Sequence, residues 1–388
     1  MIILPEHILM PDGSIRSDFA VKVSHDGTIE EVVALKKLIN KSEPIHRECG
    51  LLMPGLINCH SHLELSWCRG LFPENAGMEN FYGAMSGVHG KRPSGSMVNV
   101  CIENASLEMA ANGIVAVADI SNTDITLMPK LKSDLYFHTF LEVFGTNPID
   151  AASRFSDILK IQNVFSEENL ANSLSAHTLI TLSEKLMSLL ITRISAEKKS
   201  HSIHFLESLE EKKYFEEKIP VRNIHGYQSP APEFNSAAEA ACRLLLPDNR
   251  IMFVHNTFAD ENDIRTLTGN FRDPWFCFCP ASNLYITGKL PDVPMISSIS
   301  QNILLGTDSL SSNNELNLFS EIDILLAHFP EIYPEVLLKA ATINGARFLG
   351  IDNQYGSIEA HKKPGLVLLE NYRPGIRKFS SLKIKRLI

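Results

Sequence analysis

The chain has 388 residues, 44% of them hydrophobic, which is enough for one large domain with a full core and a modest accessory domain. Lys and Arg number 36 against 45 Asp and Glu, and the resulting net charge of -9 argues against a nucleic-acid partner. No apolar run approaches the roughly 18 residues that a membrane span needs, so we expect no membrane partner.

The first ten residues, "MIILPEHILM", lack the basic start and the small-residue cleavage site of a secretory signal. The seven cysteines are scattered through a long chain, which indicates reduced thiols rather than a disulfide framework. We therefore expect a cytoplasmic protein. Cys277 and Cys279 stand too close together for a zinc finger, and apolar core thiols are favoured there over metal ligands.

The two ends of the chain read as β structure. Near the N-terminus, "DFAVKVSHDGTIEEVVAL" contains Asp26-Gly27, which favours a tight hairpin with φ > 0 at both positions. A second strand-like segment, "GSIEAHKKPGLVLLEN", lies at 356–371. We predict one small β-sandwich domain built from both termini, 1–52 plus 353–388.

Between the termini, short apolar runs alternate with stretches of helical period such as 99–112 and 237–246. The runs are continuous and rich in Ile, Val and Phe, as expected for strands that are covered on both sides. There are eight of them, at 51–60, 113–121, 136–144, 172–178, 202–208, 250–258, 275–283 and 302–310. Eight alternations predict an α/β fold, a (β/α)8 TIM-type barrel over residues 53–352.

Polar residues stand at the ends of four predicted strands: His60 and His62 on the first, His204 on the fifth, His255 on the sixth and Asp308 on the eighth. In such barrels the C-terminal ends of the strands form the active face. Each residue alone has a simpler interpretation, a hydrogen-bonded core histidine or, for Asp308, a helix cap. Together they predict a site for one divalent metal ion, Zn²⁺ or Fe²⁺, which would lower the pKa of a bound water from about 16 toward about 7.

Several segments resemble, in order, the amidohydrolase superfamily, and within it the branch of cytosine, guanine and S-adenosylhomocysteine deaminases and triazine chlorohydrolases. The matching segments are "PGLINCHSHLELSWCRGL", "SAHTLITLSEKL", "HFLESLEE", "VHNT", "FCPASNLYITG" and "LLGTDSLSSNNELNLFSEI". The resemblance implies a single metal ion, most often zinc with iron or manganese as alternatives, held by His60, His62, His204 and Asp308. It also implies that His255 lies beside the metal-bound water.

The resemblance further assigns Glu207, three residues after His204, as the proton shuttle. A solvated surface charge is the simpler interpretation of this residue. An aromatic amidine carbon resists attack until its ring nitrogen is protonated, and ammonia leaves only if the amine also gains a proton. One carboxyl group close to the water can meet both needs.

For substrate binding, the resemblance implies a contact from His177, which could instead be a helix-capping or buried histidine. Ser309 follows Asp308 where the family often has Gly, so the pocket floor differs there. "HLELS" and "SSNNELNLF" are similar to aminodeoxyfutalosine deaminases, which act on an adenine nucleoside in menaquinone synthesis. Glu64 and Ser66 are then candidate substrate contacts, although Glu64 could equally be a supporting carboxylate or a loop charge.

Two further features concern the rim of the expected pocket. Arg69 and Arg154 are candidates for pairing with a substrate carboxylate, since arginine forms two parallel hydrogen bonds with such groups. Residues 71–97 read as irregular chain, either a mobile lid or an ordinary surface loop with a short helix.

The function expected from these residues is a metal-dependent hydrolase of carbon–nitrogen bonds that replaces an exocyclic amine on a purine-like ring. The alternatives are cytosine or guanine deamination, chlorohydrolase activity, imidazolonepropionase-type ring hydrolysis, and a non-catalytic relative that acts as a binding protein. The expected partner is a small-molecule substrate, and the resemblance also implies a homodimer.

Overall fold

Two four-stranded parallel sheets lie at the centre of the computed structural model, which describes residues 1–38, 44–88, 92–197, 199–220 and 233–388. One sheet has the order β6-β7-β8-β9 and the other the order β10-β11-β12-β13. Their strands are β6 (Leu56–Ser61), β7 (Ile114–Ser121), β8 (Tyr136–Val143), β9 (Ala171–Ala176), β10 (His201–Phe205), β11 (Arg250–His255), β12 (Asp273–Phe278) and β13 (Ile303–Leu305). Each of the eight predicted apolar runs overlaps one of these strands, although β6, β9, β10 and β12 extend one or two residues beyond their runs.

Backbone hydrogen bonds join the two sheets at both seams. The His204 amide of β10 donates to the carbonyl of His177, just after β9, at 2.9 Å, and the Thr307 amide after β13 donates to the His60 carbonyl of β6 at 3.1 Å. Gly306 is required at the second seam, because a Cβ there would lie 2.6 Å from the Cβ of His60. An apolar cluster that includes Phe140, Cys277 and Cys279 is shared by strands of both sheets, which confirms the prediction that Cys277 and Cys279 are core thiols.

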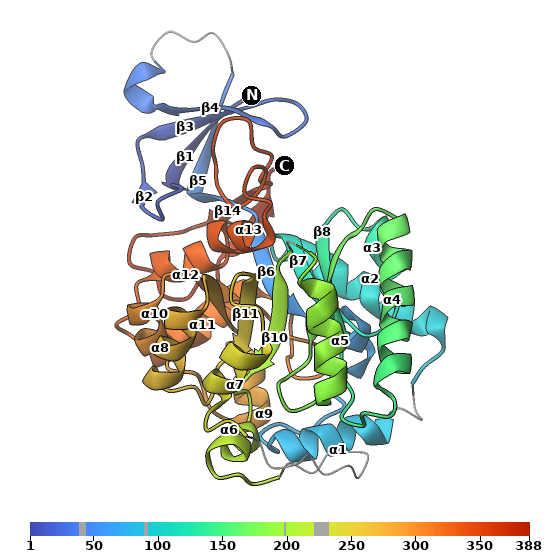
Figure 1. Cartoon of the computed structure of the whole chain (residues 1–388). Coiled ribbons are helices and arrows are strands. Elements are labelled where there is room, and N and C mark those ends of the chain that lie inside the picture. Colours follow the sequence, from blue (N-terminus) through green and yellow to red (C-terminus); the bar gives the residue numbers. More distant parts are fainter. Residues whose placement is uncertain (39–43, 89–91, 198, 221–232) are drawn as a thin grey trace.

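Helices surround the two sheets (Figure 1). They are α1 (Met78–Val88), α2 (Gly95–Ala111), α3 (Leu127–Lys132), α4 (Ala151–Glu167), α5 (Glu184–Ile194), α6 (Leu209–Glu216), α7 (Ala237–Leu244), α8 (Glu261–Asn270), α9 (Pro280–Thr287), α10 (Val293–Ile299), α11 (Leu318–His328), α12 (Pro334–Ala340) and α13 (Ile343–Leu349). Strands covered by helices bury nearly every side chain, as in β7, where all eight residues are buried. Each fully buried Phe, such as Phe205 or Phe253, contributes about 1.5–3 kcal/mol.

Both termini contribute to a third sheet at one end of the molecule (Figure 1). Its seven strands are β1 (Ile2–Leu9), β2 (Ile15–Arg16), β3 (Phe19–Val23), β4 (Ile29–Ala34), β5 (Ile45–Pro54), β14 (Leu366–Glu370) and β15 (Lys383–Arg386). The predicted hairpin joins β3 and β4, but only Gly27 of its turn has a positive φ, of 90°. The described residues form one sheet here, so the two facing sheets of a sandwich are not established.

The predicted first run, 51–60, is divided between two strands. Residues up to Pro54 belong to β5 of the terminal sheet, and β6 begins at Leu56. Residues 71–97 are not simply irregular chain, because Met78–Val88 form α1 and α2 begins at Gly95, while 89–91 lie outside the described residues. Within the described part of the chain, no helix combines the length and apolar character that crossing a bilayer requires.

Candidate metal centre and active site

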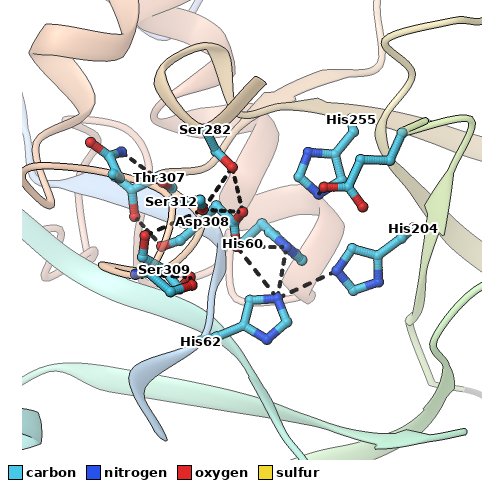
Figure 2. Close-up of polar contacts among 12 residues, drawn as sticks. His60, His62, His204, His255, Ser282, Thr307, Asp308, Ser309 and Ser312 are labelled. Carbon is cyan, nitrogen blue, oxygen red and sulfur yellow. Dashed lines mark hydrogen bonds and ion pairs between the residues drawn. The ribbon is translucent and has the colours of Figure 1, made fainter. Parts of the chain in front are cut away.

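Three imidazole nitrogens converge at the C-terminal ends of β6 and β10. Nε2 of His62 lies 3.2 Å from Nε2 of His60 and 3.4 Å from Nε2 of His204. All three side chains point toward one another in Figure 2. In a tetrahedral zinc site with bonds of about 2.0–2.1 Å, neighbouring ligand atoms are about 3.3–3.4 Å apart. The spacing of these nitrogens therefore fits one shared metal ion.

The carboxylate of Asp308 completes this group. Its Oδ1 lies 3.5 Å from Nε2 of His62 and 3.7 Å from Nε2 of His60. The strand β13 is shorter than the predicted run, so Asp308 stands three residues beyond its end. The positive φ of Asp308, 56°, turns the chain there toward the histidines. Burial acts to raise the pKa of Asp308, but His62, His255 and two serine hydroxyls lower it below its ordinary value, so the group is an anionic acceptor.

Glu207 and His255 lie beside the same group: the His255 ring is 5.4 Å from the rings of His60 and His204, and ligand atoms of Glu207, His255 and Asp308 lie within 4.8 Å of one another. Nε2 of His255 is 3.4 Å from Oε1 of Glu207. Burial raises the pKa of Glu207 to about 8, against the opposing effect of His204. Burial also lowers the pKa of His255 to about 3, so its ring is neutral. A carboxyl whose pKa lies this close to neutrality, beside a neutral imidazole, can both take up and release protons near the candidate metal ligands.

The backbone at these strand ends is strained. Leu206 after β10, His255 and Asn256 at the end of β11, and Asp308 after β13 all have positive φ values, between 46° and 72°. Such conformations cost of the order of 1–3 kcal/mol each and persist where the surrounding structure enforces them. Here they aim Glu207, His255 and Asp308 toward one centre.

Two buried carboxylates that the sequence analysis did not single out support the metal histidines. Nδ1 of His204 donates to the His177 carbonyl at 3.0 Å and lies 3.3 Å from Oε1 of Glu142. Burial lowers the pKa of His204, but Glu142 outweighs it and raises the pKa to about 9. Because Nδ1 donates, the proton that a bound metal ion would displace is the one on Nε2, the atom that faces His62.

Asp119 supports the turn that carries His62. Its Oδ1 accepts the Leu63 amide at 2.8 Å, and its Oδ2 lies 2.5 Å from Nζ of Lys130. Asp119 and Lys130 are both fully buried. The signal in the sequence was an acidic residue inside a continuous apolar run, "VAVADIS" for Asp119 and "FHTFLEVF" for Glu142, since charged residues are rarely buried without a partner.

Of the predicted substrate contacts, His177 lies beside the histidine cluster, whereas Glu64 and Ser66 form hydrogen bonds with neighbouring loops and turns. The His177 ring is 4.9 Å from that of His204 and 6.5 Å from that of Tyr82 on α1. Glu64 is buried; its Oε1 accepts a hydrogen bond from the Asn122 amide, and its Oε2 accepts from the amide and the hydroxyl of Thr123. The Ser66 hydroxyl donates to the Leu63 carbonyl, at 2.7 Å.

The other candidates, Ser309, Arg154 and Arg69, differ in how they relate to the site. Ser309 is buried and its hydroxyl contacts Ser311. The guanidinium of Arg154 lies over the ring of Phe144, 5.7 Å from its centroid, and that ring is 6.1 Å from the ring of His177. Arg69 instead forms an ion pair with Glu108. Arg154, of the two arginines, is therefore the one connected to the site through aromatic contacts.

The sequence matches the profile of the amidohydrolase family over residues 51–386. The chain belongs to the amidohydrolase family. The expected resemblance is confirmed, and so is the expected enzyme class, a metal-dependent hydrolase of carbon–nitrogen bonds.

Among its relatives, an adenosine deaminase of Helicobacter pylori is 28% identical over 332 residues, which cover 82% of this chain and 78% of the relative. An aminodeoxyfutalosine deaminase of Nitratiruptor is 24% identical, over 95% of this chain and 91% of the relative. The crystal structure of Helicobacter pylori aminofutalosine deaminase in complex with methylthio-coformycin matches all of both chains with a TM-score of 0.85 and 22% identity. That likeness establishes the α/β fold of this amidohydrolase.

Proposed function

We propose that this amidohydrolase deaminates adenine nucleosides by hydrolysis, with aminodeoxyfutalosine as a candidate substrate. The convergence of His60, His62 and His204 with Glu207, His255 and Asp308 at one set of strand ends carries the proposal. Support for the adenine ring comes from relatives named adenosine, aminodeoxyfutalosine, 5'-deoxyadenosine and 5-methylthioadenosine/S-adenosylhomocysteine deaminases. Cytosine or guanine deamination, chlorohydrolase activity, imidazolonepropionase-type hydrolysis and a purely binding role are less well supported.

In this proposal, His60, His62, His204 and Asp308 hold one divalent ion, most favourably zinc. When bound, such an ion lowers the pKa of a coordinated water and opposes negative charge in the transition state. The nitrogen-rich ligand set, with spacings of 3.2 and 3.4 Å between imidazole nitrogens, is what favours zinc over magnesium or calcium.

Proton transfer is assigned to Glu207. As the carboxylate, it takes one proton from the attacking water and gives it to the ring nitrogen. It then takes the second proton, from the hydroxyl now bonded to the ring carbon, and gives it to the amine, so that the carbon–nitrogen bond breaks, the carbonyl forms and ammonia leaves. His255, neutral and 3.4 Å from Glu207, orients the reacting oxygen. Asp308, anionic and 3.5 Å from His62, helps to hold the same oxygen in place.

Substrate binding is assigned to His177, Glu64, Ser66 and Ser309, with Arg154 for a substrate carboxylate. His177 lies between His204 and the aromatic rings of Tyr82 and Phe144, where a flat base can pack. For Glu64 to contact a sugar hydroxyl, it would have to do so in addition to its bonds with Asn122 and Thr123.

The remaining assignments concern architecture and context. We assign the eight central strands to a closed (β/α)8 barrel over 53–352, and the terminal sheet to a small β-sandwich domain of 1–52 plus 353–388. We also propose a homodimer in the cytoplasm whose ligand is a small molecule, not a nucleic acid or a membrane. Sedimentation of the purified chain would test the dimer.

The central test is ammonia release by the purified, zinc-loaded chain from a panel of adenosine, 5'-deoxyadenosine, methylthioadenosine, aminodeoxyfutalosine, cytosine and guanine. Adenine nucleosides should react. Glu207→Gln should lower kcat by about 10²–10⁴-fold without loss of zinc, because the carboxamide cannot carry the proton. Glu210→Gln, an exposed change on α6, is the matched control. Reaction with cytosine or guanine alone, or a chain that takes up no metal, would refute the proposal.

A further inference from the structure

The two oxygens of Asp308 have different partners. Oδ1 faces the histidines, 3.5 Å from Nε2 of His62. Oδ2 accepts hydrogen bonds from the hydroxyls of Ser282 at 2.6 Å and Ser312 at 2.8 Å. Figure 2 shows both serines on the side of the carboxylate that points away from the histidines. The two hydroxyls prevent the carboxylate from rotating and leave only Oδ1 directed to the metal site.

The residue after Ser282 contacts the other reactive group. Nδ2 of Asn283 donates to the Thr257 hydroxyl at 2.6 Å and lies 3.4 Å from Nδ1 of His255. An amide N–H is only a donor, so Nδ1 of His255 must accept and the ring proton must lie on Nε2. That Nε2 is the atom 3.4 Å from Oε1 of Glu207. Asn283 therefore selects the tautomer that presents a donor to the proton carrier.

Ser282 and Asn283 belong to the first turn of α9, and this turn is itself held in place. The Ala281 amide donates to Oε2 of Glu321 on α11 at 2.8 Å. The other oxygen of Glu321 accepts from Nδ2 of Asn313 at 2.8 Å, and Nδ2 of Asn313 also donates to the Thr307 carbonyl beside Asp308. One buried carboxylate thus connects the start of α9 to the loop that carries Asp308 and Ser312.

We propose that the first turn of α9 is a positioning element for the reaction: Ser282, together with Ser312, directs Oδ1 of Asp308 to the metal ion, and Asn283 keeps the proton of His255 on Nε2. This inference deepens the proposed function and rests on it. Neighbouring residues of one helix then control two different properties, the affinity for the ion and the proton arrangement beside Glu207. None of the three residues needs to touch the substrate.

The serine pair is tested by metal affinity. Ser282→Ala/Ser312→Ala should weaken zinc binding by about 10–100-fold in chelator competition, because partners of metal ligands affect affinity by that amount. Ser106→Ala is the matched control, since that buried hydroxyl donates only to the Ile102 carbonyl of its own helix. Ser312→Thr keeps a hydroxyl at this position, so its zinc affinity should be close to that of the wild type. Zinc affinity of the double variant equal to that of Ser106→Ala would overturn the proposal.

If the double variant does not fold, Ser312→Ala alone decides, because Ser282 still donates to Asp308. A smaller but measurable loss of zinc affinity supports the proposal, and an unchanged affinity overturns it. These measurements need no substrate. A wrong substrate assignment would therefore leave them intact, whereas a wild-type chain that binds no zinc would refute the proposed function itself along with this inference.

Asn283 is tested by nuclear magnetic resonance of the zinc-loaded protein labelled with ¹⁵N-histidine, with the His255 signals assigned from their loss in His255→Gln. The wild-type ring should be protonated at Nε2. Asn283→Asp should move the proton to Nδ1, which then donates to the new carboxylate, and should lower kcat by about 10²-fold. Its zinc affinity should change far less than that of the serine variant. A wild-type ring protonated at Nδ1, or equal losses of zinc affinity and kcat, would overturn the assignment.

Discussion

Oε1 of Glu142 lies 3.3 Å from Nδ1 of His204, on the side of the ring opposite the metal site. A carboxylate in this position fixes the ring orientation and strengthens Nε2 as a ligand. Glu142→Gln should therefore weaken zinc binding by about 10–100-fold in chelator competition. Glu167→Gln, exposed at the end of α4, is the control and should bind zinc like the wild type. Equal affinities of the two variants would show that Glu142 does not support the ligand.

The buried pair of Lys130 and Asp119 lies behind the turn that follows His62. Lys130→Met should lower the free energy of unfolding by about 3–5 kcal/mol, because it leaves the Asp119 carboxylate buried without its charge partner. Asp119→Asn/Lys130→Met removes both charges, so its free energy of unfolding should fall by less than that of Lys130→Met. Denaturant titration of both variants checks this order, and a double variant less stable than the single one would contradict it.

Gly306 lies against the backbone of His60 at one seam between the central sheets. Gly306→Ala should lower the free energy of unfolding by about 1–3 kcal/mol, because the added Cβ must displace His60. The same displacement should weaken zinc binding. Gly269→Ala on α8 is the matched control. No atom described in the structure lies within 4 Å of its added Cβ, and alanine there should stabilise the helix by up to about 1 kcal/mol. Thermal melts and chelator competition measure both effects.

His138 is buried on β8, with Nε2 2.9 Å from the Ser173 hydroxyl. Burial lowers the pKa of His138 to about 3. Below a pH of about 6.5, the unfolded chain binds a proton that the folded chain excludes, so folding stability falls as the pH drops toward 3. At pH 5.5 this loss is about 1.4 kcal/mol relative to pH 7.5.

His138→Gln should be less stable than the wild type at pH 7.5 and should lose less stability on going to pH 5.5. Denaturant titration at both pH values, on both proteins, gives the difference. The same pH-dependent loss in wild type and variant would mean that His138 is not the titrating group.

Much of the architecture followed from patterns along the chain. Continuous apolar runs located all eight central strands, because strands buried on both sides need no polar alternation. Polar residues at the ends of those runs, such as His60, His204 and Asp308, indicated the centre, since the C-terminal ends of the strands in the predicted barrel meet at one face. Residues 71–97 were less predictable. Helix α1 forms within them, and its residues Met78 and Phe81 pack with residues of α9, a contact between distant segments that a local sequence period does not predict.

Patterns and motifs along the chain were enough to predict the α/β fold, the family and the residues that converge at the candidate metal centre. The contacts that hold those residues became visible in the folded molecule: Glu142 beside His204, Asp119 at the turn after His62, and Ser282 and Asn283 beside Asp308 and His255. These contacts join segments that lie far apart in the sequence. A periodic pattern reports which face of an element is buried, whereas a hydrogen bond between elements depends on side-chain directions that are set only when the sheets and helices pack together.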